Sequence, residues 1–458
     1  MNQIYHDLLQ RQQEYFHRGT TRSAAFRLER LNALHDAIRR REPMLMDALR
    51  RDLGKSAGEA LLSEIGMVYE ELKLFRRRLN RWMKPRRAAI APANWPAAGS
   101  IYPEPYGSVL IFSAWNYPFN LALIPLIGAI AAGNCVILKP SELAPATAAA
   151  VASLIREVFV PEHVAVCEGG PETGEELLRE RFDLVFFTGS SATGRRVYSR
   201  AAEQLTPVIL ELGGKSPCIV DEDAMVWLAS RRICWGKFLN AGQTCVAPDY
   251  LLLHRDVKKR FLETMQNSLL RQFGPDPKTS PDYPRIINER HFDRLAALLD
   301  SGKAVIGGQT DREQKYIAPT VLDEVSPDSP VMTEEIFGPI LPIIEFTHLE
   351  EALNFVNQRE KPLALYYFSR SHQKQRQVID ATSSGGVCIN ETVVHLANPS
   401  LPFGGVGHSG IGSYHGEHSF RTFSHEKPVL FKPDLPDLPL RYPPYTKRKM
   451  RLLHWIFR

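Results

Sequence analysis

The amino-acid sequence predicts an α/β protein with two large domains, the first of them a doubly wound parallel sheet. The chain has 458 residues, which is more than one simple hydrophobic core usually serves. Between residues 108 and 211, short continuously apolar runs of strand length alternate with helical stretches. Such alternation is typical of a parallel sheet that helices cover on both faces. Ligands of these sheets bind at the carboxyl ends of the strands, and polar and glycine-rich residues collect there in this sequence.

The predicted strands and helices of this first domain follow each other in strict order. The strands are expected at 108–114, 135–139, 164–167, 184–187 and 208–211. The helices are expected at 119–132, 144–158, 174–180 and 192–204.

The residues before this domain have helical periodicity. Apolar residues recur at intervals of three and four over 23–53 and over 56–83, which predicts amphipathic helices with their charges on the solvent side. The arginine clusters 39–41 and 76–78 are therefore interpreted as solvated helix faces. Residues 85–105 are rich in Pro and Ala without any period, which favours an extended arm or edge strand.

A second α/β domain is expected from residue 216 onward, and no internal repeat is found. It begins with a helix at 227–239 and continues with a strand at 250–254 and a helix at 257–273. Further strands are expected at 304–307, 340–346, 363–368 and 387–389. The chain after residue 425 is Pro-rich.

Composition and charge exclude several classes of protein. Apolar residues make up 44% and charged residues 23%, as in an ordinary soluble protein. The net charge of +5 is too small to indicate a nucleic-acid partner. No signal peptide or membrane-spanning stretch is recognised. The six cysteines lack the spacing of a zinc site or a disulfide framework, so we expect no metal and a cytoplasmic location.

The candidate chemistry centres on Cys245. This cysteine follows a polar Gly-Gln-Thr turn directly after a predicted helix, where backbone N–H groups could favour its thiolate. Glu211 ends the last strand of the first domain and precedes paired glycines. The two residues suggest a nucleophile with a separate general base. The alternative is a small buried cysteine and an unrelated loop carboxylate.

Weaker signals point to a dinucleotide and an oxyanion. Gly189 to Gly194 follow a strand and open a helix, where free N–H groups suit a pyrophosphate, although an ordinary Ser190 cap would look the same. Lys139 and Glu142 could hydrogen-bond a ribose or simply form a surface ion pair. The Asn116 amide could hold an oxyanion or cap the next helix.

Two further stretches lie later in the chain. Glu335 and Phe337 precede a predicted strand and suit contacts with a ribose and a nicotinamide. The glycine-dense stretch 402–410 is either part of the site or a plain mobile loop.

Taken together, these stretches resemble the aldehyde dehydrogenase family. They follow the family's order across most of the chain, and 245–250 and 410–416 resemble its class 3 branch of fatty and aromatic aldehyde dehydrogenases. The matching motifs are Trp115-Asn-Tyr-Pro118, Lys139-Pro-Ser-Glu142, Phe187-Thr-Gly-Ser190, Leu210-Glu-Leu-Gly-Gly-Lys-Ser-Pro217, Gly242-Gln-Thr-Cys245, Glu335-Ile-Phe-Gly-Pro339 and Leu401-Pro-Phe-Gly-Gly-Val406.

The resemblance implies NAD(P)-dependent oxidation of medium- or long-chain aliphatic or aromatic aldehydes to acids. Cys245 would attack the aldehyde, Asn116 would stabilise the oxyanion, and Glu211 would activate water to hydrolyse the thioester. NAD is the expected cofactor, with NADP as an alternative, and Glu142 could favour NAD through the ribose 2′-hydroxyl. The residues implied to contact it are Trp115, Lys139, Glu142, Gly189, Ser190, Gly194, Leu212, Glu335, Phe337 and Phe403.

The resemblance also implies a division of the chain and a homodimer. Residues 1–84 and 106–210 would form the NAD(P)-binding domain, and 211–395 the catalytic domain. Residues 85–105 and 396–458 would be bridging and oligomerisation segments with a C-terminal tail.

Three alternatives stay open at this stage. Family members that acylate coenzyme A typically lack the carboxylate of Glu211, so its presence favours hydrolysis. A non-catalytic binding protein would be expected to lose Cys245 or Glu211, and both are present. The basic and apolar segment 447–458 could lie on a membrane surface, dock on a partner subunit or be disordered.

Overall fold

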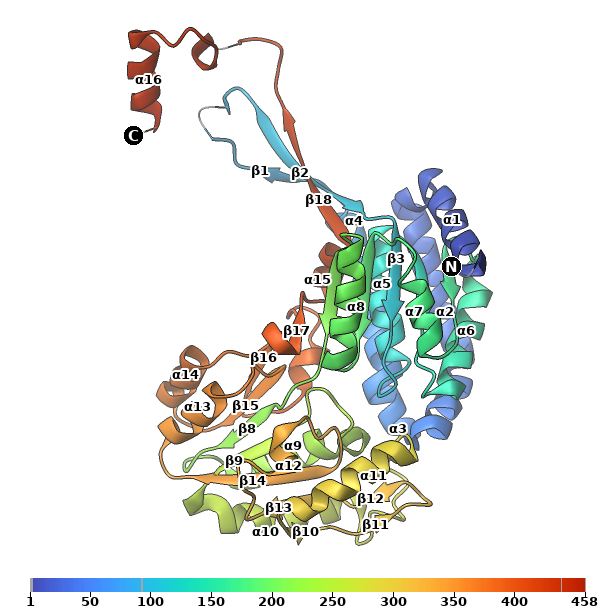
Figure 1. Cartoon of the computed structure of the whole chain (residues 1–458), viewed down its shortest axis with the longest axis vertical. Helices are drawn as coiled ribbons and strands as arrows, with labels where there is room; N and C mark the ends of the chain where they lie inside the picture. The colour runs from blue at the N-terminus through green and yellow to red at the C-terminus, as the bar shows by residue number, and fades with distance from the viewer. Residues whose placement is uncertain (1–2, 92–93, 438, 458) are drawn as a thin grey trace.

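A computed structural model describes residues 3–91, 94–437 and 439–457 of the chain. Two sheets form the body of the molecule, and a long arm projects from it (Figure 1). The first sheet has six strands in the order β17-β7-β6-β3-β4-β5, parallel except for β17. Its strands are β3 (Ser108–Phe112), β4 (Cys135–Lys139), β5 (Val164–Val166), β6 (Leu184–Thr188), β7 (Val208–Glu211) and β17 (Gly410–Ile411).

Alternate residues of these strands belong to two separate apolar cores, which is why the strands are apolar throughout. On β3, Val109 and Ile111 enter the larger core, whereas Leu110 and Phe112 enter the smaller one. Side chains of a strand alternate between the two faces of a sheet, so helices cover both faces. The larger core includes α2 (Ala24–Leu53), α4 (Gly66–Trp82), α5 (Asn120–Ala132) and α6 (Pro145–Val158), and the smaller one α1 (Gln3–His17), α7 (Pro171–Leu177) and α8 (Ser191–Glu203).

The second sheet has seven strands in the order β10-β13-β14-β9-β8-β15-β16, parallel except for β10. They are β8 (Pro217–Val220), β9 (Tyr250–His254), β10 (Lys303–Ile306), β13 (Thr320–Asp323), β14 (Ile340–Phe346), β15 (Ala364–Phe368) and β16 (Gly386–Ile389), with a small hairpin of β11 (Thr310–Asp311) and β12 (Tyr316–Ile317). Its helices are α9 (Val226–Phe238), α10 (Lys258–Phe273), α11 (Glu289–Leu298), α12 (Pro330–Thr333), α13 (Leu349–Asn357) and α14 (His372–Ala381).

The arm is a three-stranded antiparallel sheet in the order β1-β2-β18. Its strands are β1 (Arg86–Ala88), β2 (Ala98–Pro105) and β18 (Ser424–Phe431), and α15 (Gly416–Thr422) leads into β18. Beyond β18 the chain ends in α16 (Lys447–Phe457), which lies past the arm and away from both sheets (Figure 1).

The structure confirms the predicted α/β class and the parallel sheets, and it corrects the prediction at several elements. Residues 426–431, interpreted as part of a Pro-rich tail, belong to strand β18, and the sequence did not predict β8, β11, β12, β13 or β17. The helix expected at 174–180 begins at Pro171 and ends at Leu177. The second amphipathic stretch is interrupted by a π-helical turn, Leu61–Ile65, between α3 (Ala57–Ala60) and α4.

Charges in the N-terminal helices also depart from the prediction. The arginine clusters at 39–41 and 76–78 are largely solvated, as expected. In contrast, Arg27, Lys55, Glu64 and Glu71 are buried, although an amphipathic pattern would put their charges in solvent. No helix among the described residues is both long enough and apolar enough to cross a membrane.

Candidate active site

The loop that carries Cys245 leaves α9 through a tight, strained turn. Asn240 and Ala241 both have left-handed backbone conformations, with φ of 51° and 50°. Gly242 follows with φ of 74°, and a β-carbon there would lie 2.2 Å from the carbonyl oxygen of Gly338. Only glycine fits this close approach. The turn thereby packs the loop against the Glu335-Ile-Phe-Gly-Pro339 motif and presents Cys245 as a partly buried side chain.

Gln243 fixes the loop from inside. Its side-chain amide donates hydrogen bonds to the carbonyl oxygens of Asn240 and Arg285, each at 3.0 Å. Its side-chain oxygen accepts a bond from the Ile287 N–H, also at 3.0 Å. These three bonds satisfy a fully buried amide and hold the strained turn in one conformation.

Asn116 meets this loop from the other sheet. Its side-chain amide donates to the Gln243 carbonyl oxygen at 3.1 Å, and its own carbonyl oxygen accepts from the Asn240 amide at 2.7 Å. The hydroxyls of the neighbouring residues Tyr117 and Thr244 are 2.6 Å apart. Asn116 does not cap the next helix, because the residue at that cap is Phe119. The structure therefore brings Asn116 to the Cys245 loop, with one amide hydrogen free of this bond.

A buried ion pair contacts the backbone of Asn116, and the sequence analysis did not find it. Lys55 lies 2.6 Å from Glu64, and both side chains are fully buried. The Lys55 ammonium also donates to the Asn116 carbonyl oxygen at 3.0 Å and lies 4.0 Å from the centre of the Tyr117 ring. Glu64 accepts the Asn120 N–H at 2.8 Å. The helical pattern gave no signal for this pair, and the π turn Leu61–Ile65 that carries Glu64 is seen only in the structure.

Glu211 ends β7 as a buried carboxyl group. Only 3% of the residue is exposed, and neither carboxyl oxygen has a hydrogen-bond partner among the described residues. Burial raises the pKa of Glu211 well above that of an ordinary glutamate. A desolvated, unpartnered carboxylate next to a thiol is well suited to accept a proton from a small molecule such as water.

Glu335 lies against the two glycines that follow Glu211. A β-carbon on Gly213 would be 1.9 Å from a Glu335 carboxyl oxygen, so only glycine leaves room for it. Burial raises the pKa of Glu335 to about 8, with Asp249 adding to the rise, while the Gly214 N–H, Lys215 and Arg294 oppose it. The ELGGK and EIFGP motifs thus meet in one place.

The surroundings of Cys245 oppose the thiolate that its backbone N–H groups would favour. Burial raises the pKa of the Cys245 thiol to about 12, and the carboxyl groups of Glu335 and Glu211 add to the rise. The backbone N–H groups of Cys245 and Val246 lower it, but by less. These surroundings favour the neutral thiol, so a base that takes its proton would assist the reaction of Cys245.

The dinucleotide motif forms a tight corner between β6 and α8. Ser190 caps α8, with its hydroxyl 3.3 Å from the Thr193 nitrogen, as the simpler interpretation of this motif expected. A β-carbon on Gly194 would lie 2.6 Å from the Leu212 side chain, so glycine allows β7 and α8 to pack closely. Lys139 pairs with Glu142 at 2.8 Å at the end of β4, separated from β6 by β3.

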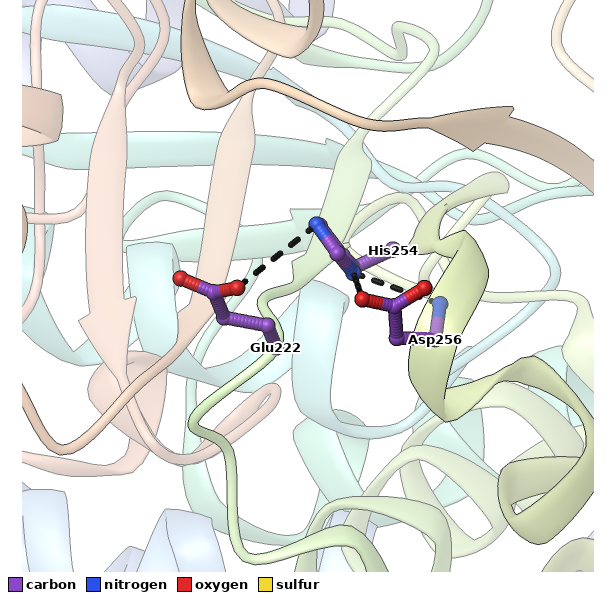
Figure 2. Close-up of side chains that lie close together, drawn as sticks. All are labelled: Glu222, His254 and Asp256. Atoms are coloured by element: carbon purple, nitrogen blue, oxygen red, sulfur yellow. Dashed lines mark hydrogen bonds and ion pairs between the residues drawn. The ribbon is translucent and has the colours of Figure 1, made fainter.

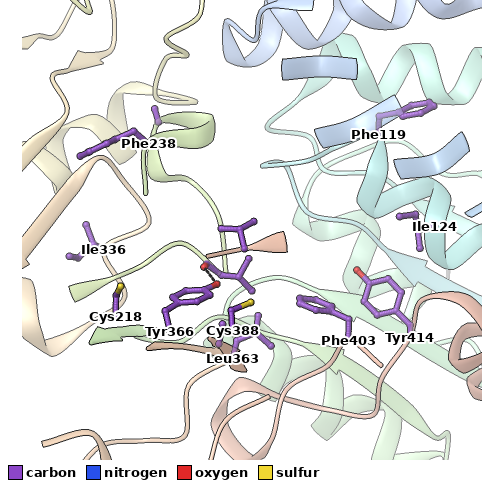
Figure 3. Close-up of a cluster of buried hydrophobic side chains, with 14 of the residues drawn as sticks. Phe119, Ile124, Cys218, Phe238, Ile336, Leu363, Tyr366, Cys388, Phe403 and Tyr414 are labelled. Atoms are coloured by element: carbon purple, nitrogen blue, oxygen red, sulfur yellow. Dashed lines mark hydrogen bonds between the residues drawn. The ribbon is translucent and has the colours of Figure 1, made fainter. Parts of the chain in front are cut away.

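Aromatic side chains lie on either side of this region. Trp115 packs edge-on against Phe337, with ring centres 5.3 Å apart. Phe403 packs against Tyr414 at 5.8 Å, and Figure 3 shows this pair next to Cys388 and Tyr366. The Tyr366 hydroxyl donates to the Val246 carbonyl oxygen at 2.5 Å, which ties this cluster to the residue after Cys245.

Two lysines near the EIFGP motif, the partly buried Lys215 and the buried Lys237, were assigned no role from the sequence. Lys215 bonds Asp249 and the carbonyl oxygens of Val331 and Glu334. Lys237 is fully buried without a hydrogen-bond partner among the described residues, and burial lowers its pKa to about 8. No sequence pattern distinguishes it from an exposed helical lysine.

A cavity of about 690 Å³ opens beside the Cys245 loop. Phe238 and Leu239 line it and lead directly into Asn240. Charged residues line other parts of it, and Glu59 lies between the cavity and the loop. Its apolar lining consists of Leu62, Leu228, Trp235, Phe238, Leu239, Phe273 and Val394.

Figure 2 shows the group that comes nearest to a metal site in the described part of the chain: Glu222, His254 and Asp256. One His254 nitrogen lies 2.8 Å from the Thr347 carbonyl oxygen and the other accepts the Asp256 N–H at 3.3 Å. Each carboxylate lies 4.0 Å from the ring. Because both ring nitrogens are engaged, we assign no metal ion to this group.

The fold and this convergence of motifs define a class of enzyme. The model of the aldehyde dehydrogenase family matches residues 5–429, and the chain belongs to this family. It is thus an oxidoreductase that acts on aldehydes.

Three relatives are each 48% identical to the chain. They are aldehyde dehydrogenase family 3 member B1 of Rattus norvegicus (98% of this chain and 96% of the relative), 4,4′-diaponeurosporen-aldehyde dehydrogenase of Staphylococcus aureus (97% of each) and the dimeric NADP-preferring aldehyde dehydrogenase of Rattus norvegicus (97% and 99%).

A solved structure described as the substrate-bound state of Staphylococcus aureus AldH superimposes with a TM-score of 0.97. It is 46% identical and covers 100% of both chains. These comparisons confirm the resemblance to the family, and the family 3 relative confirms the resemblance to its class 3 branch.

Proposed function

We propose that the protein oxidises medium- or long-chain aliphatic or aromatic aldehydes to carboxylic acids with NAD(P)⁺, through a thioester on Cys245. The observation that carries the proposal is the convergence of three groups from separate elements. The Cys245 thiol follows α9, the Asn116 amide follows β3, and the unpartnered Glu211 carboxyl ends β7. Together they supply a nucleophile, an oxyanion donor and a base.

Each group has one task in this reaction. The Cys245 sulfur loses its proton to a base and bonds the aldehyde carbon. The free Asn116 amide hydrogen and the Cys245 backbone N–H stabilise the negative oxygen that results. Glu211 later takes a proton from water, which attacks the thioester carbonyl and releases the acid and the Cys245 thiol.

A nicotinamide dinucleotide supplies the hydride acceptor when it is bound. The residues present fit this group: the buried Thr188 hydroxyl at the end of β6 has no partner among the described residues. Gly189 and Gly194 keep the turn into α8 compact, because a β-carbon there would meet Phe187 or Leu212. Lys139 and Glu142 would hold the adenosine ribose, and Glu335 the nicotinamide ribose. Trp115, Ser190, Leu212, Phe337 and Phe403 would complete the contacts.

The cofactor is proposed to be NAD, with NADP as an alternative. Glu142 supports NAD, because a carboxylate can accept a hydrogen bond from the ribose 2′-hydroxyl but repels a 2′-phosphate. The name of the NADP-preferring rat relative supports the alternative. Glu142 is partly exposed and already paired with Lys139, so it can turn away from a phosphate.

The cavity beside the Cys245 loop supports an apolar substrate. Its aromatic and aliphatic lining and its volume of about 690 Å³ suit a long chain better than a small polar aldehyde. The name of the S. aureus relative, a diaponeurosporen-aldehyde dehydrogenase, is in keeping with this class.

The test is reduction of NAD⁺ and NADP⁺ by the purified protein with a panel of aldehydes and no coenzyme A. The panel holds aliphatic aldehydes of short, medium and long chain, benzaldehyde and cinnamaldehyde. We expect turnover without coenzyme A, and kcat/KM that rises at least tenfold from short to long chains because each buried methylene contributes about 0.8 kcal/mol. Turnover that appears only in a parallel reaction with added coenzyme A would support an acylating enzyme. Cofactor binding without turnover in either reaction would support a binding protein.

The arm supports a homodimer. β1, β2 and β18 project from the body, and β18 is an edge strand with the exposed side chains Leu430 and Phe431. Open strand edges with apolar side chains favour pairing with a second chain. The printed name of the dimeric rat relative agrees with this proposal. We also propose the division into a cofactor-binding part (1–84 and 106–210), a catalytic part (211–395) and bridging segments (85–105 and 396–458), since each sheet has its own helices.

We propose that the enzyme is cytoplasmic and that α16 contacts a membrane surface. The free cysteines are in keeping with a reducing compartment. α16 carries Lys447, Arg448, Lys449 and Arg451 beside apolar side chains, and none of its described residues is buried. Trp455 and Phe457 are 79% and 73% exposed, although large aromatic residues are rarely left in water. Basic residues and exposed aromatics together favour an anionic bilayer.

Removing residues 447–458 tests the membrane proposal. We expect the full-length protein to float with anionic vesicles, and the truncated protein to lose at least about tenfold in bound fraction, since each basic residue near the surface contributes about 1 kcal/mol. The double variant Trp455→Ser/Phe457→Ser separates aromatic insertion from charge. Equal flotation of full-length and truncated protein would remove the proposal, and a change in dimer mass would instead assign α16 to the partner subunit.

A further inference from the structure

Glu59 links the cavity to the Cys245 loop. It lies on α3, a short helix that begins after the Ser56 cap. Its carboxyl oxygen accepts the backbone N–H of Asn240 at 2.9 Å. Ser56, Gly58 and Glu59 also line the cavity, opposite residues of α9. One carboxyl group therefore contacts both the space beside the loop and the first strained residue of the loop itself.

The bond to Asn240 reaches the reacting groups through a short chain of contacts. The Asn240 side chain donates to the carbonyl oxygens of Asn116 and Gln243, at 2.7 and 3.1 Å. The Gln243 carbonyl oxygen also accepts the Asn116 amide that we assign to the oxyanion. Asn240 holds φ at 51°, which a non-glycine residue adopts only when its neighbours fix it. Glu59 supplies one of those fixing contacts.

We propose that Glu59 is a positioning and specificity-determining residue, which anchors the Cys245 loop through Asn240 and makes binding of apolar aldehydes depend on its own protonation. This inference rests on the proposed function for the identity of the reaction, but its binding component can be measured without turnover. The neutral carboxyl gives the cavity a less polar wall. The carboxylate must lose hydration when an apolar chain is buried against it, which weakens binding.

The surroundings of Glu59 put its titration in the working range of an enzyme. Burial raises the pKa of Glu59 to about 7, and Glu64 and Asp282 add to the rise. Lys55 and the Asn240 N–H oppose it. The charged or titratable groups that face Glu59 or share its cavity are Lys55, Glu64, Tyr117, Arg231, Arg232, Asp282, Tyr283 and Glu391.

The pKa of about 7 for Glu59 sets the direction in which KM changes with pH. Below pH 7 Glu59 is mostly protonated and the cavity is at its least polar. If only this form binds a long-chain aldehyde, KM rises by about tenfold between pH 6 and pH 8, because each pH unit above the pKa costs a factor of ten. Arg232 and Glu391 pair with each other at 3.0 Å, so their charges cancel over this range.

The experiment compares wild type with Glu59→Gln and Glu59→Leu, and with Glu263→Gln on the exposed face of α10 as the matched control. KM and kcat for a long-chain aldehyde are measured from pH 6 to pH 9. Glu59→Gln keeps an acceptor for Asn240 but cannot ionise, so its KM should stay low and flat with pH. Glu59→Leu strands a buried N–H, so its kcat should fall about tenfold at every pH while Gln restores most of it.

A second readout does not depend on turnover. Alkylation of Cys245 by iodoacetamide is followed by mass spectrometry with and without dodecanol, an apolar chain without a reactive carbonyl. In wild type, protection by dodecanol should be about tenfold stronger at pH 6 than at pH 8, and in Glu59→Gln it should not change. If the protein shows this protection pattern but no aldehyde turnover, the proposed function is overturned and the role of Glu59 is not. An identical pH profile for wild type and Glu59→Gln, or wild-type kcat in Glu59→Leu, would overturn the role of Glu59.

Discussion

The Cys245→Ala variant should lose aldehyde oxidation by about 10⁴-fold or more, because without the thiol no covalent intermediate can form. Cofactor binding should survive, since the corner of β6 and α8 belongs to the other sheet. Steady-state formation of reduced cofactor measures the first effect, and fluorescence titration with the reduced cofactor the second.

Cys167→Ala is the matched control for this prediction. Cys167 is a buried cysteine directly after β5, which lies far along the sheet from β7, so its loss removes a thiol that is distant from the proposed site. Activity that persists in Cys245→Ala above this low level would exclude the covalent mechanism. A loss of cofactor binding would instead show that the variant is misfolded.

The Glu211→Gln variant should release about one equivalent of reduced cofactor in a burst and then turn over about 10² to 10⁴ times more slowly. Glutamine fills the same volume, and it loses no hydrogen bond because neither Glu211 oxygen has a partner among the described residues. Only the base is removed, so the thioester forms and is not hydrolysed. Rapid-quench kinetics and intact-mass detection of the acyl-enzyme test this outcome.

The pH dependence of hydrolysis gives a second test of Glu211. Burial raises its pKa well above the usual range, so at low pH the group carries a proton and cannot act as a base. The hydrolysis rate of wild type should therefore increase as pH rises, whereas that of Glu211→Gln should be low and flat. Glu203→Gln at the exposed end of α8 serves as control. Unchanged turnover in Glu211→Gln would indicate another base, such as Glu335, the other carboxyl group whose charge raises the pKa of Cys245.

In the first sheet, the strands that the sequence predicted are apolar runs buried on both faces. β3, β4, β6 and β7 lie within two residues of their predicted bounds, because continuous apolar runs have few other uses in a soluble domain. β18 escaped detection because it contains Lys427 and Pro428 and lies on an edge, where neither burial nor alternation marks a strand. β8 has only four residues and continues a glycine motif that reads as a loop.

The sequence pointed to those candidate site residues that lie in short motifs combining a reactive side chain with a turn, such as Asn116 and Cys245. Asn116 and the Cys245 loop do meet, as their positions after β3 and α9 suggested. Lys55, Glu59 and Glu64 could not be found in this way, because their helical pattern assigns charges to solvent. Their burial depends on contacts with Asn120 and Asn240, which are distant in sequence and unrelated to helical period.

The strands of the arm come from distant parts of the chain, which limits when the protein can complete its fold during synthesis. β3 to β7 lie close together in the sequence, so most of the first sheet can form while the ribosome is still at work. β18, however, pairs with β2 about three hundred residues upstream, and β17 covers the edge of β7 only near the end of translation. Until then β2 and β7 each have an unpaired edge, which invites wrong partners. The arm can therefore be completed only after residue 431 has been synthesised, so a second subunit that docks on it would meet a body whose strands have all been synthesised.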